Sequence, residues 1–218
     1  MPAKERRRSG KGEDTRRHIL EASVDLFLKN GYEKTTISLI CLKAGVLPGS
    51  MYNLFRSKGD ILAEVVSEGL WETLTDSRKY SEGQSLASAL SFPILIQIYM
   101  SCRSSRVAEL LNAMYSEWEI KDKALSPLIK WIEESEEGRN LMEKPDFDLK
   151  AYASIGALSS IIERFHREPE KTDMKQSMMV VGRVFLDLFG LEENLENLVD
   201  RAISTFEKSR IRICGYLI

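Results

Sequence analysis

Apolar residues recur at spacings of three and four along most of this chain, and that period constrains the fold more than any other feature. Two such stripes, one near each end of the chain, comprise Ile19, Ala22, Leu26 and Phe27, then Leu195, Leu198, Val199, Ala202 and Phe206. This is the period of an α-helix that buries one face. Glycine (13) and proline (6) are scarce among the 218 residues, and no alternating strand pattern occurs. The sequence therefore predicts an all-α fold.

Cap and stop signals divide the first sixty residues into three helices and the start of a fourth. The cap candidates are Asp14 or Thr15, Thr35 or Thr36, and Pro48, and the glycine stops are Gly31 and Gly45. The third helix is expected to run from Pro48 to Phe55. Two helices joined by a four-residue turn at 45–48 are typical of a helix-turn-helix.

Later segments predict further helices. A fourth helix is expected over 59–77, and breaks are expected near 82–83, 103–105, 121–122, 144–146 and 169–173. The segment 149–165 mixes apolar with small residues, whereas 174–189 is apolar nearly all round. A helix of the second kind must be covered on more than one side. A last amphipathic helix is expected from Glu193 to Lys208, with an apolar tail at 211–218 that packs on the body.

The charge is divided between the two ends of the chain. The formal net charge is -2, but residues 1–62 hold 12 basic and 7 acidic side chains, against 19 and 26 in the remainder. The basic end suits contact with phosphate, while the acidic remainder would be repelled by it.

The outward face of the third helix suits a DNA groove. Gly49 and Asn53 point away from the apolar face, so the backbone can approach closely and the amide can bond adenine. Thr35 or Thr36 and Lys58 stand at helix N-termini, where N–H groups favour phosphate. An ordinary three-helix packing unit is the alternative interpretation of these features alone.

From Thr15 to Leu62 the sequence resembles the TetR (tetracycline repressor) family of bacterial transcription regulators. The resemblance rests on Ile19-Leu20-Glu21-Ala22, Leu26-Phe27, Asn30-Gly31-Tyr32, Thr35-Thr36-Ile37 with Ile40, Ala44-Gly45-Val46, Gly49-Ser50-Met51-Tyr52 with Phe55, and Ser57-Lys58 with Leu62. It implies an N-terminal three-helix DNA-binding domain and a larger helical domain for effector binding and dimerisation. It also implies DNA contacts from Thr35, Thr36, Ser38, Leu47, Pro48, Gly49, Ser50, Tyr52, Asn53 and Lys58.

Four positions depart from the family pattern, and one of them is Cys41, which stands where a small Ala is usual. Leu47 stands where a Ser or Thr cap is usual, Pro48 where a Lys is common and Ser38 where an Arg is common. Leu47 or Pro48 could instead contact a thymine methyl group. The expected division is a flexible basic arm over 1–12, the helix-turn-helix over 13–58 and the larger domain over 59–218.

The middle of the chain concentrates aromatic residues and methionines, which suit an apolar effector chamber. The candidate lining residues are Trp71, Phe92, Tyr99, Met100, Arg103, Met114, Tyr115, Trp118, Trp131 and His166. Ordinary core packing is the alternative for each of them. The aromatic residues, taken with nearby acids, weakly favour a lipophilic cation as effector.

The resemblance implies a homodimer formed by the two segments 149–165 and 174–189. The candidate interface residues are Tyr152, Gly156, Ser160, Met178, Val181, Phe185 and Leu188. A twofold dimer would present two reading helices to a palindromic operator on double-stranded DNA. An ordinary intramolecular core is the alternative for these helices.

Enzyme, cofactor and membrane interpretations find little support. The sequence has no phosphate-binding glycine loop and no nucleophile elbow, and Glu163 and His166 form only a solitary Glu-x-x-His pair. We therefore expect no cofactor, no metal, no membrane span and a cytoplasmic location. The function expected is a homodimeric repressor released from its operator by a small lipophilic effector. The alternatives are a DNA-binding regulator without an effector and an all-α enzyme or carrier.

Overall fold

A computed structural model of the chain describes the backbone of residues 3–81, 85–208, 212–213 and 216–217. Side chains are described for residues 12–72, 85–123, 126, 129–130 and 132–208. The described helices are α1 (Ala3–Asn30), α2 (Ile37–Ala44), α3 (Pro48–Tyr52), α4 (Lys58–Ser81), α5 (Leu86–Arg103), α6 (Ser105–Ser116), α7 (Trp118–Glu133), α8 (Glu136–Met142), α9 (Phe147–Arg167), a 3₁₀ turn (Pro169–Lys171), α10 (Met174–Phe189) and α11 (Leu195–Lys208).

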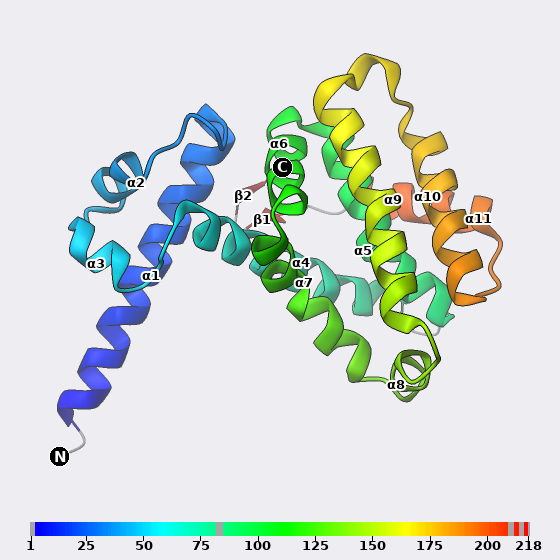
Figure 1. The fold of residues 1–218 in the computed structure, drawn as a ribbon, viewed down its shortest axis with the longest axis horizontal. Helices are drawn as coiled ribbons and strands as arrows, with labels where there is room; N and C mark the ends of the chain where they lie inside the picture. The colour runs from blue at the N-terminus through cyan, green and yellow to red at the C-terminus, as the bar shows by residue number, and fades with distance from the viewer. Residues whose placement is uncertain (1–2, 82–84, 209–211, 214–215, 218) are drawn as a thin grey trace.

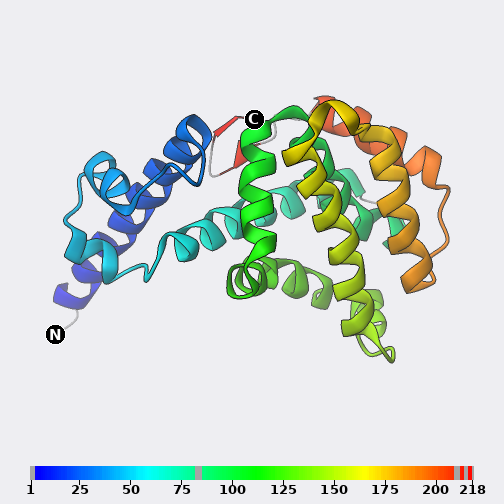
Figure 2. The same ribbon diagram turned by 45° about the horizontal axis from the view of Figure 1, so that its top comes forward.

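The predicted all-α class is confirmed, and the helices form two lobes (Figure 1). Helices α1 to α3 make a small N-terminal lobe, and α5 to α11 make the larger body. Helix α4 leaves the small lobe and runs into the body, as the turned view in Figure 2 also shows. The tail adds a short antiparallel hairpin of β1 (Arg212–Ile213) and β2 (Tyr216–Leu217), and β1 lies against α4.

The first helix is longer than the sequence predicts. It begins at Ala3 rather than at Asp14 or Thr15, so residues 3–12 continue α1 instead of forming a flexible arm. Lys, Arg and Glu are good helix formers, and Pro2 directly before them is compatible with a helix start. Gly10 and Gly12 therefore weaken this part of the helix without ending it.

The turn between α2 and α3 follows the predicted signals. Thr36 caps α2 by accepting a hydrogen bond from the N–H of Leu39, and Gly45 ends it in the left-handed region at φ 67°. Pro48 begins α3 without a side-chain cap from Leu47. The expected extension of α3 to Phe55 is wrong, since the helix ends at Tyr52 and the chain then turns to bury Phe55 and begin α4.

One break is misplaced along the sequence. The expected break at 121–122 does not occur, because α7 runs unbroken through it. The break lies instead at Glu117, whose extended backbone separates α6 from α7. Neither Lys nor Asp stops an established helix as Gly or Pro does, so the local signal at 121–122 was weak. The breaks at 103–105, 144–146 and 169–173 are confirmed, while 82–84 lies outside the described residues.

Helix α5 is the centre of the body. It packs against α4, α6, α9, α10 and α11. By length and composition alone it could cross a membrane, with a mean hydropathy of 1.2 over 18 residues, and it is the one such helix in the described part of the chain. Within the fold 67% of that stretch is buried inside the protein, so the apolar run serves as the core of the bundle.

Two glycines of the helix-turn-helix allow a matched test of backbone strain. A Cβ at Gly45 or at Gly49 would meet no atom within 4 Å, but only Gly45 has a positive φ. We expect Gly45→Ala to lower the free energy of unfolding by about 1–2 kcal/mol. Gly49→Ala should leave it unchanged or raise it by up to about 1 kcal/mol, because Ala favours helix. Urea unfolding midpoints measure both, and equal losses would contradict the strain argument.

Candidate nucleic-acid interface and effector chamber

The small lobe buries one face of α2 and α3 and leaves the other open. Ile40 and Met51 are fully buried, Phe55 is 2% exposed, and α2 packs against α1 and contacts α3. The open face carries most of the predicted DNA-contacting residues, namely Thr36, Ser38, Leu47, Pro48, Gly49, Ser50, Tyr52 and Asn53. Asn53 follows the end of α3 but keeps helical angles, with φ -71° and ψ -22°, and so continues the same outward face.

The adjacent threonines have different roles. Thr35 is 1% exposed, and its hydroxyl donates to the carbonyl oxygens of Gly31 at 2.8 Å and Leu26 at 3.3 Å. It therefore ties the α1–α2 connection together and cannot offer its hydroxyl to a phosphate, which corrects the expectation for this residue. Thr36 is exposed at the N-terminus of α2, where a phosphate would also meet unpaired backbone N–H groups.

Lys58 begins α4 in a partly buried position. Its Nζ donates to the carbonyl oxygen of Tyr32 at 2.8 Å and lies 4.1 Å from the centroid of the Tyr32 ring. Burial, with Glu117 and Glu33 nearby, raises the pKa of Tyr32 to about 12, so the phenol stays neutral. An ammonium group has three donors. The Tyr32 contact therefore leaves donors that could reach a phosphate, and this role remains a prediction.

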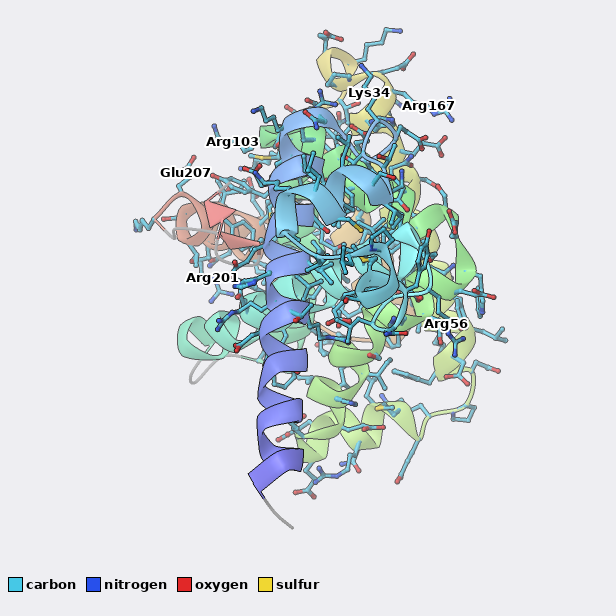
Figure 3. The ribbon with its side chains drawn as sticks, turned by 90° about the vertical axis from the view of Figure 1, so that its left-hand side faces the viewer. Lys34, Arg56, Arg103, Arg167, Arg201 and Glu207 are labelled. Atoms are coloured by element: carbon cyan, nitrogen blue, oxygen red, sulfur yellow. The ribbon has the colours of Figure 1, made fainter. Side chains whose placement is uncertain are left out.

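Other exposed residues on the small lobe were not predicted. Leu42 is 80% exposed on α2, close in sequence to Leu47, which is 76% exposed. Arg56 and Lys34 are exposed cations, at the α3–α4 connection and before α2 (Figure 3). Arg56 stands two residues before Lys58, and this spacing of cations was a signal that the sequence offered. An apolar residue as exposed as Leu42 had no such signal, because helical periodicity alone does not show which face stays uncovered.

The small lobe is fastened to α4 near its reading face. Arg16 on α1 forms an ion pair and two hydrogen bonds with Glu64 on α4. The same guanidinium lies 4.9 Å from the ring centroid of Phe55. A bidentate Arg–carboxylate pair fixes orientation as well as distance. The pair therefore fixes the orientation of α1 relative to the first turns of α4.

The body contains an apolar cavity of about 160 Å³ between α5, α6, α7, α8, α9 and α10. Side chains such as Leu90, Ile94, Leu158 and Phe189 line its interior. This is the kind of mostly apolar space that small-molecule sites use. We define these walls and the space within them as the chamber.

A hydrogen-bonded pair of polar side chains lies in the wall of the chamber. The hydroxyl of Tyr115 donates to Gln97 Oε1 at 2.8 Å, and Gln97 Nε2 donates to the carbonyl oxygen of Pro93 at 2.9 Å. Tyr115 is 9% exposed and Gln97 is 2% exposed. Burial raises the pKa of Tyr115 far above its usual range, which keeps the hydroxyl protonated. Gln97 stood out in the sequence as an amide within the apolar run 92–100, yet we did not predict it.

A stacked aromatic pair and a cation stand at the exposed edge of the chamber. Trp118 and Tyr152 stack with ring centroids 5.1 Å apart, and they are 57% and 43% exposed. Lys121 Nζ lies 4.8 Å from the Trp118 ring and 5.8 Å from the Tyr152 ring. The chain's own cation thus lies over these aromatic faces, and a lipophilic cation as effector stays a prediction.

Nine of the ten predicted effector residues have described side chains, and of these nine Tyr115 and Trp118 line the chamber. Phe92 and Tyr99 pack on Phe206 of α11, and Arg103 pairs with Glu207 at 3.5 Å. Met114 is buried in the core, whereas His166 is exposed near the end of α9. Trp71 on α4 lines a separate surface depression. The side chain of Trp131 lies outside the described residues. The prediction did not include the opposite wall of the chamber, because α9 and α10, which supply it, were assigned to a dimer interface.

A second void lies between the chamber and α4. Its volume is about 20 Å³, and Met100, Gln97, Val66 and Leu70 are among its lining residues. Gln97 lines both spaces, because it sits on α5 between them. The polar pair of the chamber is therefore one side chain away from the helix that carries the small lobe.

The predicted dimer residues divide into two groups. Met178, Val181 and Phe185 are 0%, 1% and 7% exposed. They fill the chain's own core, so their assignment to a partner-facing surface is wrong. Tyr152, Gly156 and Ser160 are exposed on α9, and Leu188 is half-buried on α10. The apolar pattern of α10 did not show which of its faces its own chain covers.

Two contacts join the body to the small lobe beside α4. Glu109 on α6 accepts a hydrogen bond from the N–H of Glu33 at 3.2 Å and pairs with Arg106 at 2.9 Å. Asp60 on α4 pairs with Lys123 on α7 at 3.2 Å and accepts from the N–H of Arg56 at 2.9 Å. Burial raises the pKa of Asp60, but these hydrogen bonds and nearby cations outweigh it and lower the pKa overall.

A metal centre finds no support in the described side chains. No group of three or more His, Cys, Asp or Glu that could hold a metal ion occurs among them. Glu163, of the Glu-x-x-His pair, forms an ion pair with Arg167 at 2.8 Å on the exposed face of α9.

Comparison with known proteins agrees with this geometry. Residues 19–65 match the family model of bacterial regulatory proteins of the tetR family. The HTH-type transcriptional regulator TtgR of Pseudomonas putida is 29% identical over 113 residues, covering 49% of this chain and 53% of that protein. The chain thus matches about half the length of this curated relative.

Solved structures share the fold over most of the chain. The structure of RolR in complex with resorcinol has a TM-score of 0.63 at 15% identity, covering 89% of this chain and 95% of the other. Thermus thermophilus FadR in complex with lauroyl-CoA has a TM-score of 0.61 at 17% identity, covering 82% and 96%. Residues 19–65, which contain the helix-turn-helix, therefore match the domain of the tetR family of bacterial regulatory proteins.

Proposed function

We propose that this protein is a DNA-binding transcriptional regulator that responds to a small molecule, and that it acts as a homodimeric repressor released from a palindromic operator. The observation that carries the proposal is the combination of two features in one chain. An open helix-turn-helix face lies on the small lobe, and an apolar chamber lies in the body. Helix α4 connects the two.

The structural neighbours support a ligand-responsive body without fixing the ligand. Resorcinol is a single ring, whereas lauroyl-CoA is a long acyl thioester, yet the proteins that bind them share this fold. The fold therefore hosts ligands of different sizes, and the ligand here must be inferred from the chamber of this chain.

The homodimer is proposed to form through the exposed faces of α9 and α10. On α9 the exposed residues Gly156 and Ser160 are small and permit close approach of another helix. On α10 Val180 is 53% exposed, and an apolar side chain of this kind is suited to burial against a second copy. Twofold symmetry would place two reading helices at a fixed spacing, which a palindromic operator matches.

Coupling between chamber and DNA is proposed to pass through α6 and α7. One face of α7 lines the chamber with Trp118 and Lys121, while Ile120 and Lys123 reach the first turn of α4. A Cβ on Gly59 would lie 2.7 Å from Ile120, so this contact is already close. A ligand that displaces α7 would thus shift α4. The effector needs only to bind the DNA-incompetent arrangement more tightly, with a coupling of about 1–3 kcal/mol.

The reading face can be tested with two substitutions of different expected effect. On a DNA fragment from upstream of its own gene, Asn53→Ala should relax preference at one base pair, by about 1–3 kcal/mol of discrimination. Lys58→Ala should weaken binding to all sequences alike and reduce its salt dependence. Fluorescence anisotropy against fragments with single base changes measures both, and thermal melting checks the fold of the Lys58 variant. If both variants bind all fragments more weakly and to the same extent, Asn53 does not read a base. If the wild-type protein binds no upstream fragment, the regulator proposal fails.

The contact between α6 and the small lobe can be tested with matched glutamate variants. Glu109→Ala removes an ion pair with Arg106 and the acceptor for the Glu33 N–H, whereas Glu207→Ala removes an ion pair with Arg103 that joins α11 to α5. We expect Glu109→Ala to weaken operator binding by about 0.5–2 kcal/mol, because the small lobe is held less firmly. Glu207→Ala should have no effect on operator binding. Anisotropy titrations on the same fragment provide the measurement, and equal affinities for the two variants would refute this contact as a positioning element.

A further inference from the structure

We propose that the chamber binds a neutral, single-ring aromatic compound that carries a hydroxyl group, with the Tyr115–Gln97 pair as its polar partner. This inference rests on the proposed function, since it identifies the class of effector that the regulator would take. It follows from the volume of the chamber, its walls and the hydrogen-bonding capacity of that pair.

The volume of the chamber limits the ligand to one ring. Drug-sized ligands occupy pockets of about 300–1,000 Å³. The chamber measures about 160 Å³. An engineered apolar cavity of about 150 Å³ accommodates benzene, which is the closest size comparison. A long acyl chain or a fused ring system would require the helices to move apart.

The walls favour a flat aromatic group. Phe185, Phe189 and Phe147 form a chain of tilted aromatic contacts, with ring centroids 5.0 Å apart for the first pair and 5.6 Å apart for Phe147 and Phe189. All three line the chamber. Tilted and offset contacts at such distances are the preferred arrangement of aromatic rings. A ligand ring can therefore add to this cluster in the same geometry.

The polar pair has capacity left for one hydroxyl group. Tyr115 uses its hydrogen on Gln97 Oε1, and Gln97 uses one amide hydrogen on the Pro93 carbonyl. A Gln side chain has two amide hydrogens, and a phenolic oxygen also accepts. One donor on Gln97 and the acceptor oxygen of Tyr115 are thus left for a ligand. A hydroxyl group, which both donates and accepts, satisfies both at once.

The charges favour a neutral ligand. Lys121, Asp122 and Asp148 are the charged residues of the lining, and they come from the helices that also carry the exposed Trp118–Tyr152 stack. The polar pair itself is uncharged and nearly fully buried. A charged group beside it would lose its hydration without gaining an opposite charge. A phenol keeps its proton at neutral pH and avoids this cost.

The direct test compares matched probes on the wild-type full-length chain. Isothermal titration calorimetry with phenol, toluene and benzoate separates the contributions of the hydroxyl group and of charge to the affinity. Toluene has the shape of phenol without its hydroxyl, and benzoate carries a negative charge. We expect phenol to bind about tenfold more tightly than toluene, as one neutral hydrogen-bonded group provides, and benzoate to bind more weakly than phenol. The proposal would be overturned if toluene bound with the same affinity as phenol, if benzoate bound more tightly than phenol, or if phenol did not bind.

Variants locate the binding in the chamber. Tyr115→Phe should reduce phenol affinity severalfold and leave toluene affinity unchanged. Tyr99→Phe is the matched control, because Tyr99 is equally buried but packs on Phe206 away from the chamber. Ala151→Phe, which fills the chamber from α9, should abolish binding of both probes. Equal effects of the two tyrosine variants, or phenol binding retained in Ala151→Phe, would overturn the assignment.

Failure of the ligand class inferred for the chamber can be distinguished from failure of the proposed regulator function. Binding of the upstream DNA fragment is measured without any probe and tests the regulator proposal alone. If DNA binds and phenol does not, the chemical class inferred for the chamber is wrong while the regulator proposal stands. If phenol binds with the expected variant pattern and no DNA binds, the chamber assignment stands and the regulator proposal fails.

Discussion

The burial of α5 is the constraint on which the rest of the body depends. This helix contacts five others, so its apolar residues leave the solvent only if α4, α6, α9, α10 and α11 close around it. Hydrophobic burial is the dominant favourable contribution to folding. Gln97 interrupts that apolar surface, and its amide donates to the Pro93 carbonyl and accepts from the Tyr115 hydroxyl. The same helix therefore provides the core, one wall of the chamber and Gln97 of the polar pair within it, and it contacts the helix that leads to the small lobe.

The helix-turn-helix was predictable because its signals are local. Thr36, Gly45 and Pro48 each specify a backbone conformation at one position, and the structure places them at the cap, the stop and the start that their chemistry favours. The end of α3 was missed because it is set by a non-local contact, the burial of Phe55. Thr35 and Thr36 could not be told apart from composition. Only the fold shows that one hydroxyl faces inward.

The chamber was harder to predict because its walls come from distant parts of the sequence. Aromatic density in the middle of the chain located Tyr115 and Trp118 correctly, but the opposite wall comes from Phe147 on α9 and Phe185 on α10. Helical periodicity indicates that a helix has an apolar face, but it does not indicate which neighbouring helix covers that face. Phe185 thus serves its own chain, while the exposed side of the same pair of helices is what a second copy could cover.

The separation of the lobes has a kinetic consequence. The basic end of the chain lies in the lobe that Figure 1 shows at one end of the molecule, and the acidic remainder forms the body at the other. Such a charge distribution gives the molecule a permanent dipole moment. In the proposed DNA-binding function, the electric field of the phosphates exerts a torque on this dipole. The torque turns the small lobe toward the duplex before any contact forms. Productive collisions then become more frequent at low ionic strength, and the acidic body discourages approach in the wrong orientation.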